Sequence, residues 1–182
     1  KQHLELCRDI AQKFNHEYKI DNFFKIPEPL IQKEFSRIMS LKDGLKKMSK
    51  SELSDLSRIN LTDEKDQIIN KIKKAKTDPM PMPSNISELN KRPEAKNLIG
   101  IYSSLTNLSL EKSVTEFSGK NFSVFKENLS QVLVDKIIPI SVEIKKLLND
   151  KHYLDTILFD GCEKAGNIAS KKIKKIHEIM GF

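Results

Sequence analysis

The feature that most constrains the fold is one strand-like segment followed only by helical patterns. Residues 36–41 (SRIMSL) alternate well enough to predict a short strand. From about residue 62 onward, apolar residues recur instead at the three- and four-residue spacing of amphipathic helices. A lone strand needs a sheet, and this sequence offers it no partner strand. We therefore expect a mostly α-helical chain whose early part forms the edge of a sheet-containing fold.

The helical spacing also predicts where the helices lie. Thr62 is the expected N-cap of a helix that ends in lysines near residue 76, and Pro93 suits the first position of a helix that reaches residue 105. The other predicted helices cover residues 3–18, 109–117, 123–150, 152–159 and about 163–180. Pro139 predicts a break or kink in the longest of them, and the prolines of residues 79–83 (PMPMP) predict an extended strap.

Length and charge limit the classes of function. The chain has 182 residues and a net charge of +7, which suits a polyanionic partner without requiring one. Its longest apolar runs fall short of the roughly 20 residues that cross a bilayer, so we expect no transmembrane helix. Cys7 and Cys162 are too few and too distant for a disulfide framework, which favours a reducing compartment. The first residue is Lys1 and no leader-like segment follows it, so we expect the later part of a longer protein or a processed chain.

The motif that carries chemistry is residues 47–51 (KMSKS), within a polar stretch over residues 42–57. Lys47 and Lys50 are three residues apart with a serine between them, so two ammonium groups and a hydroxyl can surround one polyphosphate. A generic pair of this spacing is usually a solvated loop. The full pentapeptide is more specific, with one chance match expected in roughly a thousand such sequences. Gly44, at the base of the loop, predicts that the loop can close and open.

KMSKS is the second signature of class I aminoacyl-tRNA synthetases, and its surroundings resemble the bacterial-type tryptophanyl-tRNA synthetases. The matching stretches are residues 1–11 (KQHLELCRDIA), 25–31 (KIPEPLI), 36–51 (SRIMSLKDGLKKMSKS), 57–63 (SRINLTD), 74–78 (KAKTD) and 92–105 (RPEAKNLIGIYSSL). The resemblance continues through the carboxy-terminal region and so covers essentially the whole chain. An intact KMSKS with lysine at its fourth position is similar to the bacterial and organellar members.

The resemblance implies a domain organisation. Residues 1–61 are expected to be the carboxy-terminal portion of the class I catalytic domain, the edge of a Rossmann-like nucleotide-binding fold that includes the KMSKS loop. Residues 62–182 are expected to form an all-helical tRNA (anticodon)-binding region, whose last helices are candidates to pack back on the catalytic domain.

The implied activity is that of a tryptophan–tRNA ligase. Such an enzyme uses ATP to activate L-tryptophan as tryptophanyl-adenylate and then transfers the aminoacyl group to tRNA(Trp). By resemblance, Lys47 and Lys50 are the catalytic residues, which neutralise the β- and γ-phosphates as pyrophosphate leaves. The remaining expected ATP-binding residues are Ile38, at the adenine, and Met48, Ser49 and Ser51, in the loop.

The resemblance also implies the ligands and partners. ATP with Mg²⁺ is the expected substrate, with no protein-bound metal. The expected partners are tRNA(Trp), L-tryptophan and ATP, with a homodimer when the enzyme is intact, no membrane, and a cytoplasmic location. The first family signature, an HIGH-type motif, is absent, because none of the histidines has that context: His3, His16, His152 and His177. We therefore expect this chain alone not to activate tryptophan.

Two alternatives stay open. The chain can be the equivalent region of a tyrosyl-tRNA synthetase, although that family's loop usually resembles KFGKS. It can also be a non-catalytic helical RNA-binding module that kept the loop as a relic.

Weaker patterns have ordinary explanations beside the functional ones. His3 and Cys7 share a helix face without a second ligand pair, so a metal site is disfavoured there. Cys162 stands alone, so we expect no iron–sulfur cluster of the kind some family members carry. The lysine-rich residues 71–76 and 171–175 are candidates for a tRNA backbone or for solvated helix faces. The phenylalanines of residues 117–125 favour a core more than a base-stacking platform.

Overall fold

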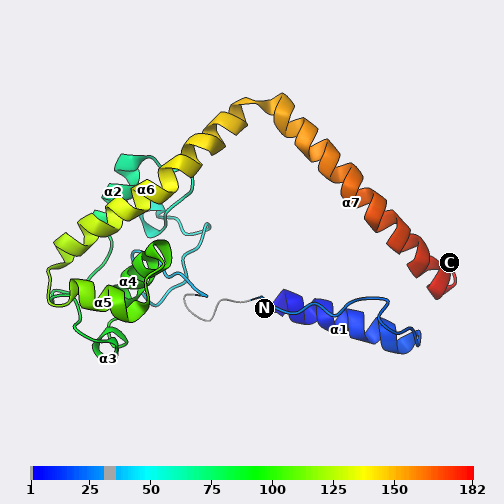
Figure 1. Cartoon of the computed structure of the whole chain (residues 1–182), viewed down its shortest axis with the longest axis horizontal. Coiled ribbons are helices and arrows are strands. Elements are labelled where there is room, and N and C mark those ends of the chain that lie inside the picture. Colours follow the sequence, from blue (N-terminus) through cyan, green and yellow to red (C-terminus); the bar gives the residue numbers. More distant parts are fainter. Residues whose placement is uncertain (1, 31–35) are drawn as a thin grey trace. The chain divides into compact units, whose positions relative to one another are not determined.

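A computed structural model of the chain describes residues 2–30 and 36–182, and those residues form helices and loops without a strand (Figure 1). The α-helices are α1 (Gln2–Glu17), α2 (Lys65–Lys73), α3 (Ile86–Leu89), α4 (Pro93–Thr106), α5 (Leu110–Phe117), α6 (Phe122–Asn149) and α7 (Lys151–Met180), with a 3₁₀ turn, η1, at Asp55–Ser57. The mostly α-helical class is thereby confirmed. Of the stretches that carry the family resemblance, Lys1 and Ile31 lie outside the described residues.

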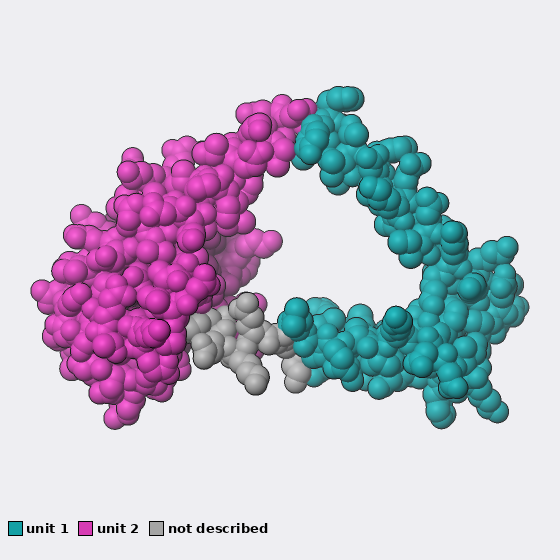
Figure 2. All heavy atoms as spheres, viewed as in Figure 1, with its two compact units in different colours: residues 1–32, 152–182 teal, residues 33–151 magenta. Residues whose placement is uncertain are grey.

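The chain divides into two compact units, which Figure 2 colours separately. One unit comprises residues 1–32 and 152–182, and the other comprises residues 33–151. The predicted boundary between a catalytic portion (residues 1–61) and a tRNA-binding region (residues 62–182) divides the chain by function and not by compactness. It stays a prediction.

The unit of residues 33–151 contains the main hydrophobic core. Helices α2, α4, α5 and α6 supply most of its apolar side chains, and Leu41 and Met82 join it from loops. The least exposed large side chains include Phe117, Phe125, Leu41, Ile68, Ile72, Met82, Leu89, Leu98, Ile99 and Leu129. The Phe117 and Phe125 rings meet edge to face with centroids 4.9 Å apart, so both phenylalanines belong to the core, as their spacing predicted.

Helix α2 begins later than the sequence predicts. Its N-cap is Glu64, whose side chain forms a reciprocal capping box with Gln67, whereas Thr62 lies outside the helix. Asp63 does not join the first turn because its carboxylate accepts hydrogen bonds from the Asn60 backbone and side chain. The local pairing of Asp63 with Asn60 therefore moves the start of the helix to a later residue.

The long carboxy-terminal helices also differ from the prediction. Helix α6 continues through Pro139 to Asn149, so of the predicted break or kink the break does not occur. Helix α7 is one continuous helix where two were predicted, and it contains both Gly161 and Gly166. A glycine inside a helix costs only about 0.5–1 kcal/mol relative to alanine, which the intervening helix-forming residues can offset.

The other unit contains α1, the loop that follows it, and α7. The rings of Phe14, Tyr18, Phe23 and Phe24 form an aromatic cluster. The Lys172 ammonium lies 3.7 Å from the centre of the Phe23 ring, a cation–π contact between α7 and the loop. Helix α7 has no buried residues, and Lys172 also donates a hydrogen bond to the Phe23 carbonyl, so this lysine joins α7 to the loop by two contacts.

The predicted strand over residues 36–41 is wrong in its extent. Only Met39 has a strand-like pairing, an isolated antiparallel bridge with Lys47. The flanking hydrogen bonds run from Ser40 N to Lys46 O (2.7 Å) and from Met48 N to Ile38 O (3.0 Å). This ladder is too short to count as a strand.

None of the helices among residues 2–30 and 36–182 combines the length and the apolarity that a membrane crossing requires.

Candidate functional site

The KMSKS signature starts at the end of a short hairpin. Residues 38–40 pair with residues 46–48, and a turn at Asp43 joins them, in which the Lys46 and Leu45 amides donate to the Asp43 carbonyl and carboxylate. The pairing fixes the backbone of Lys47 opposite Met39. The first lysine of the signature is therefore held by backbone hydrogen bonds rather than left on a free loop.

The side chains of the signature divide between solvent and core. Met48 is half-buried and packs against the main hydrophobic core. Lys47 and Lys50 are exposed, and among the described residues neither has an ion-pair partner. Ile38 is 45% exposed next to Met39. Met48 thus anchors the segment while the two ammonium groups remain available to an anion.

The two serines of the signature shape the chain between and after the lysines. The Ser49 and Ser51 hydroxyls lie 2.9 Å apart, and the Ser51 amide donates to the Ser49 hydroxyl at 3.3 Å. This is a local serine turn, which competes with helix or strand formation. It keeps Lys50, between them, at the turn.

The glycine at the base of the loop is packed tightly rather than free. A Cβ on Gly44 would lie 2.7 Å from the Glu94 nitrogen and from the Pro93 carbonyl carbon, at the start of α4. Glycine is needed here for the close approach of two backbones. Gly44 therefore fixes the loop to α4, and the predicted hinge role of this residue finds no support in its packing.

Helix α4 also holds the other side of the hairpin through Asn97. The Asn97 side chain accepts from Met39 N at 2.8 Å and donates to Met39 O at 2.8 Å. Asn97 is buried within the helix face that faces the core. The site thus combines residues that are far apart in sequence.

A charge network holds the chain that leaves the signature. Arg58 donates to the Glu52 carbonyl (2.9 Å) and pairs with Asp55 (3.1 Å). Lys71, from α2 and only 3% exposed, pairs with Asp55 at 2.6 Å and with Asp63 at 2.7 Å. The Lys71 ammonium, together with the Asn60 amide, holds the pKa of the Asp55 carboxyl below its ordinary value of 3.8. The SRINLTD stretch therefore serves to fix the end of the loop.

The first of the lysine-rich segments is thereby partly explained. Lys71 is buried in that network, and Lys76 pairs with Glu94 at 3.0 Å, so neither is a free cation for a nucleic-acid backbone. In the second segment, Lys172 contacts the Phe23 ring, while Lys171, Lys174 and Lys175 are exposed.

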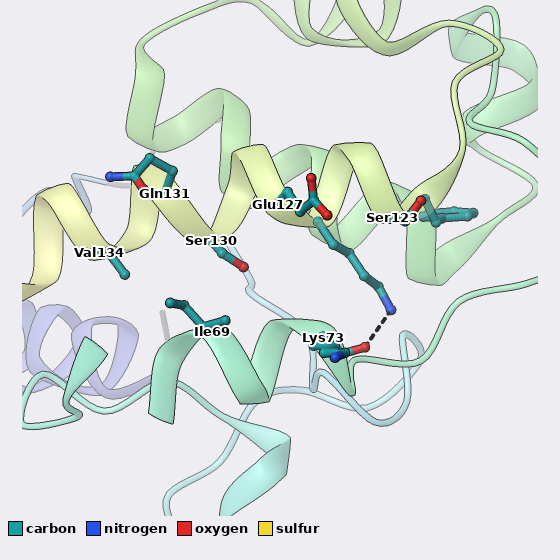
Figure 3. A pocket seen from close by; sticks show the side chains of 9 residues that line it. Ile69, Lys73, Ser123, Glu127, Ser130, Gln131 and Val134 are labelled. Carbon is teal, nitrogen blue, oxygen red and sulfur yellow. Dashed lines mark hydrogen bonds between the residues drawn. The ribbon is translucent and has the colours of Figure 1, made fainter. Parts of the chain in front are cut away.

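A separate cavity of about 530 Å³ lies between α2 and α6 and contains none of the predicted site residues (Figure 3). Its lining includes Ile69, Val134 and Lys126. The Lys126 ammonium donates to the carbonyls of Lys73 (3.1 Å) and Ala75 (2.7 Å), and burial lowers its pKa. This lysine caps the carboxy-terminal end of α2, where backbone carbonyls lack helical partners. The Lys126 ammonium therefore has a structural role, in which it stabilises the end of α2.

The described residues contain no group of three or more His, Cys, Asp and Glu side chains arranged to hold a metal ion. Cys7 and Cys162 are both exposed free thiols.

Comparison with known protein families shows to which family this chain belongs. The family model described as "tRNA synthetases class I (W and Y)" matches residues 1–135. The chain belongs to this family. The match includes the KMSKS hairpin and helices α1 to α5.

Individual relatives agree with this family. A tryptophan–tRNA ligase of Mesorhizobium japonicum is 48% identical over 200 aligned positions, which include all of this chain and 56% of the relative. The tryptophanyl-tRNA synthetase structure from Mycoplasma pneumoniae superposes with a TM-score of 0.81 at 27% identity, over all of this chain and 53% of that one. The Campylobacter jejuni enzyme, complexed with ADP and tryptophan, gives a TM-score of 0.67 at 25% identity, over all of this chain and 54% of that one. The chain thus spans about half the length of the relatives it matches.

Sequence reasoning missed the supports of the site. The signal for Asn97 is an amide within the apolar run of residues 95–102, which indicates a buried polar partner. Lys71 was grouped with exposed lysines, although Asp55 and Asp63 precede it at distances that allow a buried pair.

Proposed function

We propose that this chain is the carboxy-terminal part of a tryptophan–tRNA ligase and supplies its KMSKS loop. The observation that carries the proposal is the hairpin that fixes Lys47, followed by the serine turn that contains Lys50, in a family member whose curated relatives are tryptophan–tRNA ligases. The Campylobacter jejuni relative binds ADP and tryptophan, which supports an adenine nucleotide and tryptophan as the ligands of the complete site.

The mechanism follows from charge and position. In the activation step, the tryptophan carboxylate attacks the α-phosphorus of ATP, the bond to the bridging oxygen breaks, and pyrophosphate leaves with the added charge. Lys47 and Lys50 neutralise the β- and γ-phosphates as that charge develops. Fixed cations at developing charge are usually the largest catalytic contribution. Ile38, which precedes the hairpin bridge, offers an exposed apolar surface to the adenine, and Ser49 and Ser51 supply hydroxyls beside the phosphates.

Magnesium belongs to the nucleotide in this scheme. The polar stretch of residues 42–57 has three carboxylates, Asp43, Glu52 and Asp55. Asp43 lies 3.7 Å from the Lys46 ammonium, and Asp55 pairs with Lys71 at 2.6 Å. Phosphate oxygens are the ligands that Mg²⁺ usually keeps together with water. We therefore propose that Mg²⁺ enters with ATP and that this chain holds no metal of its own.

The remaining partners follow from the same proposal. The aminoacyl group passes from the adenylate to a terminal ribose hydroxyl of tRNA(Trp), and residues 62–182 carry the anticodon-recognising surface. The intact enzyme is a homodimer in the cytoplasm. Exposed lysines on α7, such as Lys174 and Lys175, are compatible with a polyanionic partner.

The test uses a joined enzyme, in which this chain follows the part of the Mesorhizobium japonicum relative that it does not match. We expect ATP–pyrophosphate exchange that depends on tryptophan and not on tyrosine, and we expect the 182-residue chain alone to show none. A folded joined enzyme without exchange would favour the RNA-binding alternative, and exchange by the chain alone would contradict the view that its site is incomplete.

A further inference from the structure

The residues before the signature are bonded along both edges, as a central strand would be. In an antiparallel ladder, one residue sends its N–H and C=O to one side and its neighbours send theirs to the other. Here Ser40 N and Ile38 O bond to Lys46 and Met48 on one side. Met39 N and O bond on the other side, to a side chain.

That side chain is the Asn97 amide. Its oxygen accepts from Met39 N and its nitrogen donates to Met39 O, both at 2.8 Å, across 58 residues of sequence. A carboxamide has the same donor and acceptor as a peptide group, so it can replace a neighbouring strand for one residue. Asn97 is 8% exposed, so water does not readily replace it, and an unpaired Met39 amide would carry a desolvation cost.

The consequence concerns the geometry of the nucleotide loop. Met39 follows Ile38 and lies opposite Lys47, so whatever fixes Met39 fixes both of these residues. Gly44 fixes the turn of the same hairpin to Pro93 and Glu94, three to four residues before Asn97 on α4. Helix α4 therefore holds the hairpin at its turn and at its strand-like arm.

We propose that Asn97 is a positioning residue for the KMSKS segment. Its amide sets the register of residues 38–40 and thereby the placement of Lys47 and of the surface that Ile38 offers. The link to ATP rests on the function proposed above. The effect on the hairpin backbone does not depend on that function, so the two can be tested apart.

The first experiment measures amide hydrogen exchange in the 182-residue chain. Asn97→Ala is expected to speed exchange about five-fold or more at the Met39 amide, which loses its acceptor. The same is expected at the Ser40 and Met48 amides, which donate to backbone carbonyls of the hairpin and not to Asn97. Faster exchange confined to Met39 would overturn the proposal, because Asn97 would then be a local cap without effect on the hairpin. Unchanged exchange at all three amides would overturn it as well.

The matched control is Ser103→Ala, on the same helix. Ser103 is buried and donates to the Leu108 carbonyl at 2.7 Å, so its loss removes a buried hydrogen bond away from the hairpin. Acceleration of the three hairpin amides by this variant, to the same degree, would assign the effect to general destabilisation and refute the proposal. If Asn97→Ala does not fold, Asn97→Asp replaces it, because a carboxylate still accepts from Met39 N but cannot donate to Met39 O.

The second experiment separates kinetic constants in the joined enzyme. Asn97→Ala is expected to lower kcat/KM for ATP about ten-fold or more, with KM for tryptophan within about two-fold, whereas Ser103→Ala leaves both within about two-fold. A KM for tryptophan that rises as much as kcat/KM for ATP falls would contradict a specific action on the nucleotide loop. If the unsubstituted joined enzyme shows no exchange, the proposed function fails, while the amide exchange of the chain still decides the role of Asn97.

Discussion

The packing of Gly44 against α4 leads to a quantitative prediction for Gly44→Ala. A Cβ there would lie 2.7 Å from backbone atoms of Pro93 and Glu94, whereas ordinary contacts begin at 3.4 Å, so the hairpin must move by about 0.7 Å. Forcing an extra carbon into a packed site costs about 1–3 kcal/mol. Alanine also has less conformational freedom than glycine in the unfolded chain, which stabilises the folded state by about 0.4–1 kcal/mol and offsets part of this cost. We expect a net loss of about 1–2 kcal/mol.

The assay is thermal unfolding followed by circular dichroism. For a chain of this size, a loss of 1 kcal/mol lowers Tm by about 2–4 °C. The matched control is Gly161→Ala, inside α7, where a Cβ would meet nothing within 4 Å and the helix should gain slightly. A Gly44→Ala chain that unfolds at or above the Tm of the unsubstituted chain would refute the reasoning. In the joined enzyme, the same displacement should reduce tryptophan-dependent exchange by about ten-fold or more.

Two further predictions concern the network behind the loop. Lys71→Met leaves the buried Asp63 carboxylate without its ammonium partner and should cost about 3–5 kcal/mol in urea unfolding; a loss below about 1 kcal/mol would contradict a buried pair. The Lys71 ammonium lowers the pKa of Asp55, so Asp55 stabilises the fold above its unfolded value of 3.8 and loses that contribution as pH falls through the lower folded pKa. Thermal unfolding of Asp55→Asn between neutral pH and acid should therefore depend less on pH below 3.8 than that of the unsubstituted chain, and equal slopes would exclude this role.

Local physics made much of the fold predictable. Apolar spacing located α1, α4, α5 and α6, because an amphipathic helix needs one buried face wherever it packs. Pro93 marked the start of α4 and Ser109 the cap of α5, since both act through their own backbone neighbourhood.

Two of the errors arose where a side-chain contact decides the local structure, and a third arose from the small cost of a glycine in a helix. Thr62 lost its capping role because Asp63 pairs with Lys71 and Asn60, and a strand was predicted at residues 36–41 where Asn97 replaces a partner strand. Gly161 did not end a helix because a single glycine costs too little to do so. Pairings across 58 residues, such as Asn97 with Met39, leave no periodic signal in one sequence.

For the candidate site, the sequence reveals the KMSKS motif but not the residues that hold the motif in place. KMSKS and the stretches around it pointed to the family, which the family match confirms. The roles of Lys47, Lys50, Ile38, Met48, Ser49 and Ser51 stay predictions. The burial of Met48 and the exposure of both lysines are consistent with those roles and follow from the hairpin, which residue types alone do not specify.

The central claim is that the lysines of the signature act on the phosphates of ATP, and one pair of variants tests it most directly. Lys50→Ala in the joined enzyme should lower tryptophan-dependent ATP–pyrophosphate exchange, at saturating tryptophan, by about 100-fold or more. Lys46→Ala removes an adjacent loop lysine that lies 3.7 Å from Asp43, and should change the rate by less than about three-fold. A loss below about ten-fold for Lys50→Ala, or equal losses for the two variants, would contradict the assignment.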